Sequence, residues 1–189
     1  MRRALFMLFL VIFLVSSLSG DVGPNPLLVF YDVAEVSWDR VDEDLYIAIR
    51  ELPPSVTTLG VVENLGGKSF WALKIGEILQ QRRMTVRVGI ECSSACIGMI
   101  LGAPVRIAEE DARFWIHAVQ APDADPQTLA EWRAYVAWRV VKWGMSREFA
   151  EKYLVRDSGD KWLTARDALA VGILTDVISV GRSGRADAP

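Results

Sequence analysis

The sequence has few of the residues that metal sites require. It contains 2 cysteines and 1 histidine in 189 residues. Two cysteines are too few for a closed four-ligand zinc site, and His117 brings the set only to three. A catalytic metal site of Cys92, Cys96, His117 and water would consume the histidine and leave the serines between the cysteines unexplained. We therefore expect no metal and no cofactor.

Runs of basic residues are also missing. The chain carries 21 lysines and arginines against 24 aspartates and glutamates, a formal net charge of −3. No basic stripe stands out, which argues against nucleic acid and against an anionic lipid surface as partner. Internal repeats and low-complexity tracts are absent as well. The length suits one domain with a sizeable core and is short for two.

One marked apolar segment is present, in residues 1–20 (MRRALFMLFLVIFLVSSLSG). Two arginines, an apolar stretch and a small-residue end are the layout of a secretory signal peptide. The apolar stretch is short for a membrane-spanning helix, which needs about 20 residues. An uncleaved signal anchor, and with it a membrane tether, is the alternative. We expect an exported protein, in the periplasm or on the extracytoplasmic side of the membrane.

Behind this segment, the pattern predicts one folded domain with α/β architecture. We expect a linker at 21–26, the domain over 27–180, and a disordered tail at 181–189. The expected strands are 27–36, 58–63, 84–90, 105–107, 113–118 and 173–180; the expected helices are 69–82, one that Thr128 caps, one that Ser146 caps, and 164–172, while 42–52 suits either state. Strand, glycine turn and helix alternate through the middle, which favours parallel strands.

Three features in the middle of the chain suggest chemistry. Gly66-Gly67 stands between a buried strand and a helix, where glycines leave N–H groups accessible near a helix N-terminus. Ser93-Ser94 stands where a strand runs into a short helix, a turn that often presents a nucleophile. His117, the only histidine, ends a hydrophobic strand.

The order and spacing of these features resemble the Clp peptidase family of the crotonase-like superfamily. The matching stretches are Glu63-Asn64-Leu65-Gly66-Gly67, Ser94, Gly102-Ala103 with Arg106, Phe114-Trp115-Ile116-His117, and the segment 162–174. The resemblance covers about 27–180. It implies a ClpP/crotonase-like fold, with repeated ββα units in a right-handed spiral and a helical C-terminal part.

The resemblance also implies a catalytic triad. Ser94 is the expected nucleophile, His117 its general base, and Asp157 the residue that orients and stabilises the imidazole. Ser93 is the rival of Ser94, and Asp160 is the rival of Asp157. The expected oxyanion hole consists of backbone N–H groups of Gly67 and Ala95.

Several residues depart from the family pattern. Leu65 replaces a proline, Lys68 replaces a small residue, and Glu91-Cys92 stands where the family has a glycine before its serine. These departures suggest a distant, exported branch. The exported relative signal peptide peptidase A uses a serine–lysine dyad, for which Lys68, Lys142 or Lys152 would be the candidates; the histidine makes that interpretation second choice.

The two cysteines suit a disulfide better than a metal site. Cysteine pairs tend to be oxidised outside the cytosol. Closing so small a loop stabilises the whole fold only slightly. Its value would lie in fixing the turn around Ser94, and buried free thiols of Cys92 and Cys96 are the main alternative.

The leading hypothesis is an exported, ATP-independent serine hydrolase, a peptidase acting on small or unfolded peptides. A non-catalytic envelope binding or scaffold protein of the same fold is the alternative. An acyl-CoA enzyme of the superfamily is disfavoured because coenzyme A is cytosolic. Trp132, Trp138 and Trp143 form a stripe that suits a core or a subunit interface. Crotonase-like folds commonly assemble through such helices, so we expect a homo-oligomer.

Overall fold

Strands and helices alternate along the chain in the computed structural model, which describes residues 27–30, 32–36, 39–156 and 158–179. The predicted signal segment 1–20, linker 21–26 and tail 181–189 lie outside these residues. The strands are β1 Leu27–Phe30, β2 Val33–Val36, β3 Thr58–Asn64, β4 Thr85–Ser93, β5 Val105–Glu109, β6 Arg113–Ile116, β7 Lys161–Thr164 and β8 Asp176–Ile178. The helices are α1 Glu43–Arg50, α2 Ser69–Gln81, α3 Ala95–Ile100, α4 Pro126–Lys142, α5 Arg147–Ala150 and α6 Ala165–Ala170, with a π-helical turn, η1, at Glu151–Val155.

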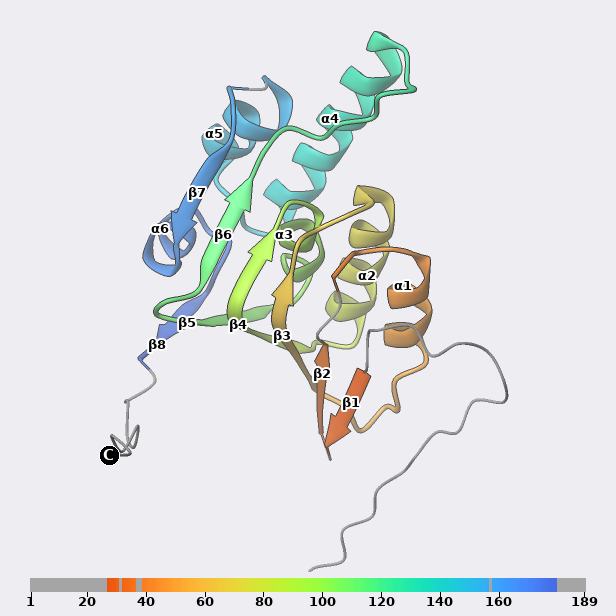
Figure 1. The fold of residues 1–189 in the computed structure, drawn as a ribbon, viewed down its shortest axis with the longest axis vertical. Helices are drawn as coiled ribbons and strands as arrows, with labels where there is room; N and C mark the ends of the chain where they lie inside the picture. The colour runs from red at the N-terminus through yellow and green to blue at the C-terminus, as the bar shows by residue number, and fades with distance from the viewer. Residues whose placement is uncertain (1–26, 31, 37–38, 157, 180–189) are drawn as a thin grey trace, which may run out of the picture.

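One mixed sheet, mostly parallel, organises these elements (Figure 1). Its strand order is β1-β2-β3-β4-β5-β8, and every pair from β2 to β8 is parallel. β4 pairs with β5 along its first half and with β6 at its carboxyl end. The carboxyl ends of β3, β4 and β6 therefore lie side by side at one edge of the sheet, where α/β proteins place their sites. The expected α/β fold is confirmed.

The first predicted strand, 27–36, is wrong as a single element. β1 and β2 instead form an antiparallel pair, with Leu27 opposite Val36. The chain turns at Asp32, whose backbone carbonyl accepts hydrogen bonds from the N–H groups of Thr57 and Thr58 at the start of β3. The turn is thus fixed from outside the hairpin.

Several helix and strand boundaries also differ from the expectation. α4 begins at Pro126 and is capped by Asp125 rather than Thr128: the Asp125 carboxylate accepts the N–H and the hydroxyl of Thr128. These bonds hold the pKa of Asp125 below its usual range. The segment 42–52 resolves as α1, capped by Asp42. β7 was not expected, and the last strand is only Asp176–Ile178.

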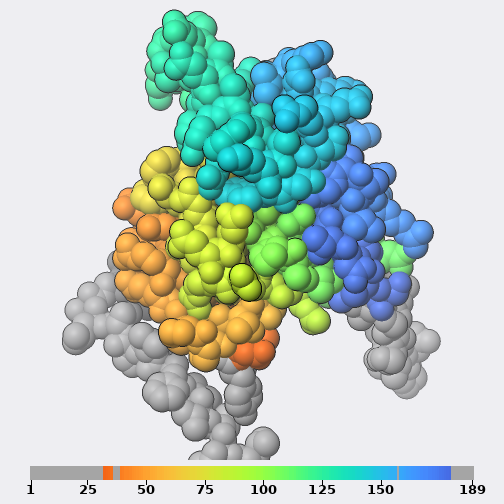
Figure 2. Space-filling view, turned by 180° about the vertical axis from the view of Figure 1, so that it is seen from behind, coloured from red at the N-terminus to blue at the C-terminus, as the bar shows by residue number. Residues whose placement is uncertain are grey.

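The tryptophan stripe of α4 divides between core and surface. Trp143 is buried against α2, where Gly76 leaves room for its ring. Trp132 donates a hydrogen bond to Ser69 Oγ at the start of α2, and Trp138 is 49% exposed. α2 and α4 lie side by side on this face, and the N-terminal end of α4 projects beyond it (Figure 2). Of the helices in the described part of the chain, none has both the length and the apolarity to cross a membrane.

A buried arginine on β5 joins the turn that precedes β5 to the turn that precedes β8. Arg106 is 6% exposed, and its guanidinium donates to the carbonyls of Leu101, Ala103, Gly172 and Ile173. Burial lowers its pKa, but a guanidinium stays charged at neutral pH. Four backbone carbonyls therefore take the place of the water molecules that would hydrate an exposed guanidinium.

Replacing this arginine should destabilise the fold. Arg106→Met removes the shared donor and leaves buried carbonyls unpaired, so we expect the free energy of unfolding to fall by about 2–5 kcal/mol in a urea titration. Arg113→Met, at an exposed position on β6, is the control and should change it by less than about 0.5 kcal/mol. Equal stability of the two variants would contradict the role given to Arg106.

Candidate active site

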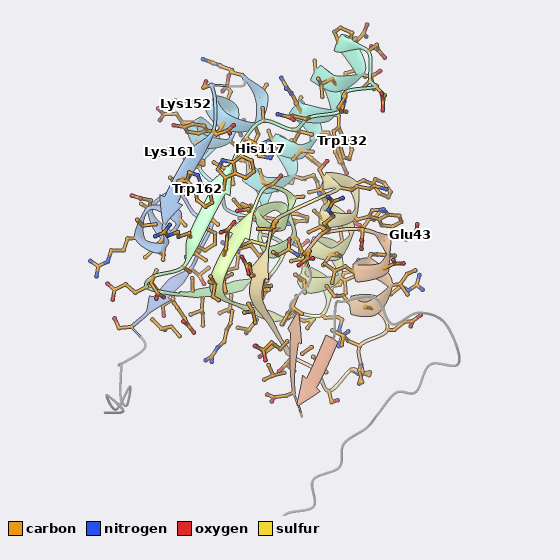
Figure 3. All side chains as sticks on the ribbon, in the orientation of Figure 1. Glu43, His117, Trp132, Lys152, Lys161 and Trp162 are labelled. Carbon is orange, nitrogen blue, oxygen red and sulfur yellow. A yellow bond between two sulfur atoms is a disulfide. The ribbon has the colours of Figure 1, made fainter. Side chains whose placement is uncertain are left out.

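Three turns meet at the carboxyl edge of the sheet and enclose a cleft of about 490 Å³. They follow β3, β4 and β6. The far wall comes from α4, and Figure 3 shows His117 and Trp132 in this upper part of the molecule. The lining residues used below are Gly67, Lys68, Ser69, Ala72, Leu73, Ser94, Ala95, Ile97, His117, Trp132, Val136, Met145 and Leu154.

Ser94 stands at the sharp turn between β4 and α3. Its backbone has φ 54° and ψ −122°, a conformation that residues with a side chain seldom adopt. Its N–H donates to the carbonyl of Trp115 at 2.7 Å. The Ser94 Oγ lies 2.7 Å from His117 Nε2, within hydrogen-bond distance. The strained turn therefore aims the hydroxyl at the histidine and into the cleft.

His117 is fixed through its other ring nitrogen. Nδ1 lies 2.7 Å from the backbone carbonyl oxygen of Ala118. A carbonyl only accepts, so Nδ1 carries the proton and Nε2 is the acceptor for the Ser94 hydroxyl. The Trp115 ring lies 4.6 Å from the imidazole, centroid to centroid, and packs in turn near Trp162. This tautomer is the one that a general base toward serine requires.

The hydrogen bonds of His117 do not identify the carboxylate of the expected triad. Asp157 lies outside the described residues. Asp160 is exposed, and among the described residues no carboxylate is hydrogen-bonded to His117. The register of β6 and β7 ends at Ile116 opposite Lys161, so the next pair along would set His117 opposite Asp160. Both aspartates remain predictions.

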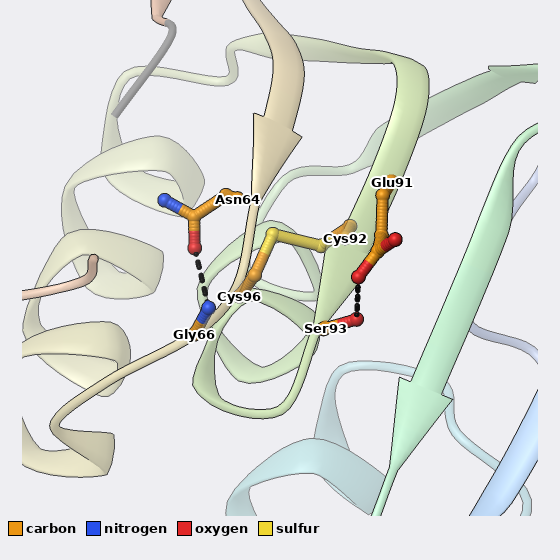
Figure 4. Close-up of a disulfide and its surroundings, with 6 residues drawn as sticks. All are labelled: Asn64, Gly66, Glu91, Cys92, Ser93 and Cys96. Carbon is orange, nitrogen blue, oxygen red and sulfur yellow. Dashed lines mark hydrogen bonds between the residues drawn. A yellow bond between two sulfur atoms is a disulfide. The ribbon is translucent and has the colours of Figure 1, made fainter. Parts of the chain in front are cut away.

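The rival nucleophile Ser93 points elsewhere. It is 1% exposed, and its hydroxyl donates to Glu91 Oε1 at 2.7 Å (Figure 4). Ser93 is not among the residues that line the cleft. The geometry therefore favours Ser94 over Ser93.

The three lysines considered for a dyad are spread apart. Lys68 lines the cleft and is exposed, whereas the ammonium of Lys142 lies 4.2 Å from the Trp138 ring centre and that of Lys152 lies 5.1 Å from that of Tyr153. The base that contacts Ser94 is His117.

The expected oxyanion donors border the same cleft. In the turn after β3, the Gly66 N–H donates to the Asn64 side chain at 2.9 Å and the Lys68 N–H to the Val41 carbonyl at 2.8 Å. No acceptor within the described chain receives the N–H of Gly67 or of Ala95. Both groups are thus available to a ligand beside Ser94.

Both glycines of this turn are required by space. Gly66 has φ +93°, and a Cβ on it would lie 2.5 Å from Ser94 Cβ. Gly67 has φ +149°, and its Cβ would lie 2.4 Å from the Val41 carbonyl oxygen. Heavy atoms do not approach so closely, so only glycine allows the turn to close on Ser94.

The predicted pair Cys92 and Cys96 lies at disulfide distance in the structure (Figure 4). It joins the end of β4 to the first turn of α3, with Cα atoms 5.4 Å apart, and both cysteines are fully buried. Sequence reasoning missed two other parts of the site: the Ala118 carbonyl that orients His117, and the Asn64 side chain that caps the glycine turn. The asparagine before Gly66-Gly67 was the available signal for the second.

Comparison with known proteins gives likeness in structure only. No protein-family model and no curated sequence matches the chain. ClpP1 from Listeria monocytogenes superposes with a TM-score of 0.66 and 18% identity, over 79% of this chain and 92% of that one. A variant of the membrane-bound stomatin-specific protease 1510-N, in complex with a substrate peptide, gives 0.58 and 16%, over 77% and 73%. Methylmalonyl-CoA decarboxylase gives 0.57 and 14%, over 82% of this chain and 68% of that one. The chain thus has the fold shared by Clp peptidases and crotonases, as expected.

The two glycines of the turn provide a test of the geometry. Gly66→Ala and Gly67→Ala each force a side chain into occupied space at positive φ, so we expect a loss of about 2–5 kcal/mol in the free energy of unfolding. Gly89→Ala on β4 is the matched control, because its nearest neighbour would be 3.7 Å away. Its unfolding midpoint should stay close to that of the unmodified chain. A Gly66→Ala variant as stable as Gly89→Ala would show that the turn is not packed on Ser94.

Proposed function

We propose that this chain, with its Clp peptidase and crotonase fold, is a serine hydrolase that cleaves peptides. The observation that carries the proposal is the 2.7 Å contact between Ser94 Oγ and His117 Nε2 at the edge of an apolar cleft. A strained serine and a histidine in the correct tautomer are what acyl transfer requires.

The reaction follows from this geometry. Ser94 Oγ attacks the peptide carbonyl carbon while His117 Nε2 takes the hydroxyl proton. The carbonyl oxygen, now negative, is stabilised by the N–H groups of Gly67 and Ala95. His117 gives its proton to the leaving amine, and the acyl group stays on Ser94. Water, deprotonated by His117, then releases the acid and restores the serine.

The cleft favours substrates with an apolar side chain. Its walls come from aliphatic residues of α2, α3 and α4 and of the helical C-terminal part, among them Leu73, Ile97, Val136, Met145 and Leu154. Burial of an apolar group gains about 25 cal/mol per Å². We propose small or unfolded peptides as substrates, because they need no unfolding motor and ATP is not available outside the cytosol.

Export and assembly belong to the same proposal. The signal-like segment 1–20 and the Cys92–Cys96 disulfide both support a place outside the cytosol, in the periplasm or at its membrane, with 1–20 as a tether if uncleaved. The exposed rings of Tyr135 and Trp138 on α4 support assembly into a homo-oligomer.

The first test is labelling with a fluorophosphonate, which reacts with activated serines. We expect labelling of the mature protein, no labelling of Ser94→Ala, and unchanged labelling of Ser93→Ala. His117→Ala should slow labelling by about 10²- to 10⁴-fold, because the general base is lost.

Two results would count against the proposal. An unlabelled wild type with intact fold would favour the non-catalytic envelope scaffold, for which Leu65 and Glu91 in place of the family's proline and glycine would be the sequence reason. If Ser94→Ala is labelled as strongly as the unmodified protein, Ser94 is not the nucleophile. Labelling also separates a hydrolase from an acyl-CoA enzyme that uses only the oxyanion donors.

The second test concerns the carboxylate. We propose that Asp157 completes the triad, so Asp157→Asn should lower kcat by about 10²- to 10⁴-fold with little change in KM. Asp160→Asn is the matched control and should retain kcat within about threefold. The reverse pattern in steady-state kinetics would give the role to Asp160. If neither aspartate variant lowers kcat, the Ala118 carbonyl is the group that orients His117.

A further inference from the structure

We infer that the Cys92–Cys96 disulfide positions Ser94 for catalysis, so that the chain is fully active when the pair is oxidised and has a lower kcat when it is reduced. The inference rests on the proposed hydrolase function. Cys92 and Cys96 are absent from the cleft lining, so they act through Ser94 and do not contact substrate. They are positioning residues.

The disulfide encloses the nucleophile. It spans a separation of four residues, with Ser94 in the middle, and connects the end of β4 to the first turn of α3. Both ends of the strained turn are therefore held at fixed spacing by one covalent bond. The strand before the turn is paired on both sides, through Cys92 with β3 and through Cys92 and Ser93 with β6. At Ser94 itself the N–H donates to the Trp115 carbonyl, the carbonyl accepts the Ile97 N–H, and Oγ contacts His117.

The backbone of Ser94 opposes this arrangement. At φ 54° and ψ −122° it stores strain that is released if the turn relaxes. Such strain persists only where neighbours determine the conformation, and it amounts to about 1–3 kcal/mol. Removal of the tie should therefore lower the population of the active turn by about 5- to 150-fold, at 1.4 kcal/mol per tenfold.

The same disulfide also stabilises the glycine turn after β3, which carries the Gly67 N–H. Cys92 lies opposite Asn64 in the parallel register of β3 and β4. The Asn64 side chain accepts the Gly66 N–H (Figure 4), and Gly66 lies so close to Ser94 that a Cβ on it would be 2.5 Å from Ser94 Cβ. A shift of Cys92 would therefore reach both the nucleophile and the turn that carries the Gly67 N–H.

Formation of the bond is a balanced two-electron exchange. The two thiols react with an external disulfide, such as oxidised glutathione: one sulfur–sulfur bond forms in the protein, and the reagent is released as two thiols that carry the two protons and two electrons. A chain that has not met an oxidising environment would thus be folded but have a lower kcat.

The experiment compares oxidised and reduced full-length mature protein. Reduction with dithiothreitol is verified by thiol titration, and kcat, KM, fluorophosphonate labelling rate and melting temperature are measured on both forms. We expect kcat and the labelling rate to fall by about 5- to 150-fold on reduction, KM to change less than about threefold, and oxidised glutathione to restore activity. Because the closed loop is small, the melting temperature should fall by only a few degrees.

Two variants make the result specific. Cys92→Ala/Cys96→Ala should show the low kcat of the reduced chain and no response to dithiothreitol. Ile49→Val, buried on α1 away from the turn, lowers stability without touching the site and should keep the wild-type kcat.

Three results would overturn the inference. They are full activity after verified reduction, full activity of the double alanine variant, and loss of the fold in both, which would make the disulfide a general staple. Failure of the proposed function is separate, because it appears as an unlabelled oxidised wild type.

Discussion

The site depends on one contact, in which the glycine turn after β3 closes on the serine turn after β4. Gly66 approaches Ser94 so closely that no Cβ fits between them. This approach sets the Gly67 N–H, the Ala95 N–H and the Ser94 hydroxyl at one mouth of the cleft. Since the two turns follow adjacent parallel strands, the register of β3 and β4 determines where the turns lie relative to each other along the strand direction. The arrangement of nucleophile and donors is therefore a property of the backbone.

A strained nucleophile needs neighbours that hold it. Ser94 adopts positive φ because a hydrogen bond to Trp115, the packing of Gly66 and the Cys92–Cys96 disulfide act on three sides of it. Folding energy from the surrounding core offsets the local strain, and buried groups far from the chemistry, such as Arg106, contribute to that core. Pre-organisation of this kind reduces what the reaction itself must reorder.

Local patterns made much of the fold and part of the site predictable. Gly66-Gly67, Ser94 and His117 each follow a strand, and a strand end is readable from hydrophobic alternation and turn residues. Tertiary contacts hid the rest. The turn at Asp32 depends on hydrogen bonds from the start of β3, which is distant in sequence. The local pattern of 27–36 therefore resembles a single strand. β7 carries the exposed Trp162 and is stabilised by β6. The Ala118 carbonyl leaves no trace in sequence, because every residue has one.

The pairing of β6 with β7 connects the fold to the charge balance of His117. During acyl transfer His117 becomes positive, and the Ala118 carbonyl dipole offsets only part of that charge beside an apolar cleft. A carboxylate would offset more. β7 runs antiparallel to β6 with Ile116 opposite Lys161, so Asp160, the residue before β7, lies at the end of the strand pair from which His117 follows. A strand that the sequence pattern does not reveal thus brings the chain before Lys161 to the end of β6, which is why a carboxylate from this segment is the one to test.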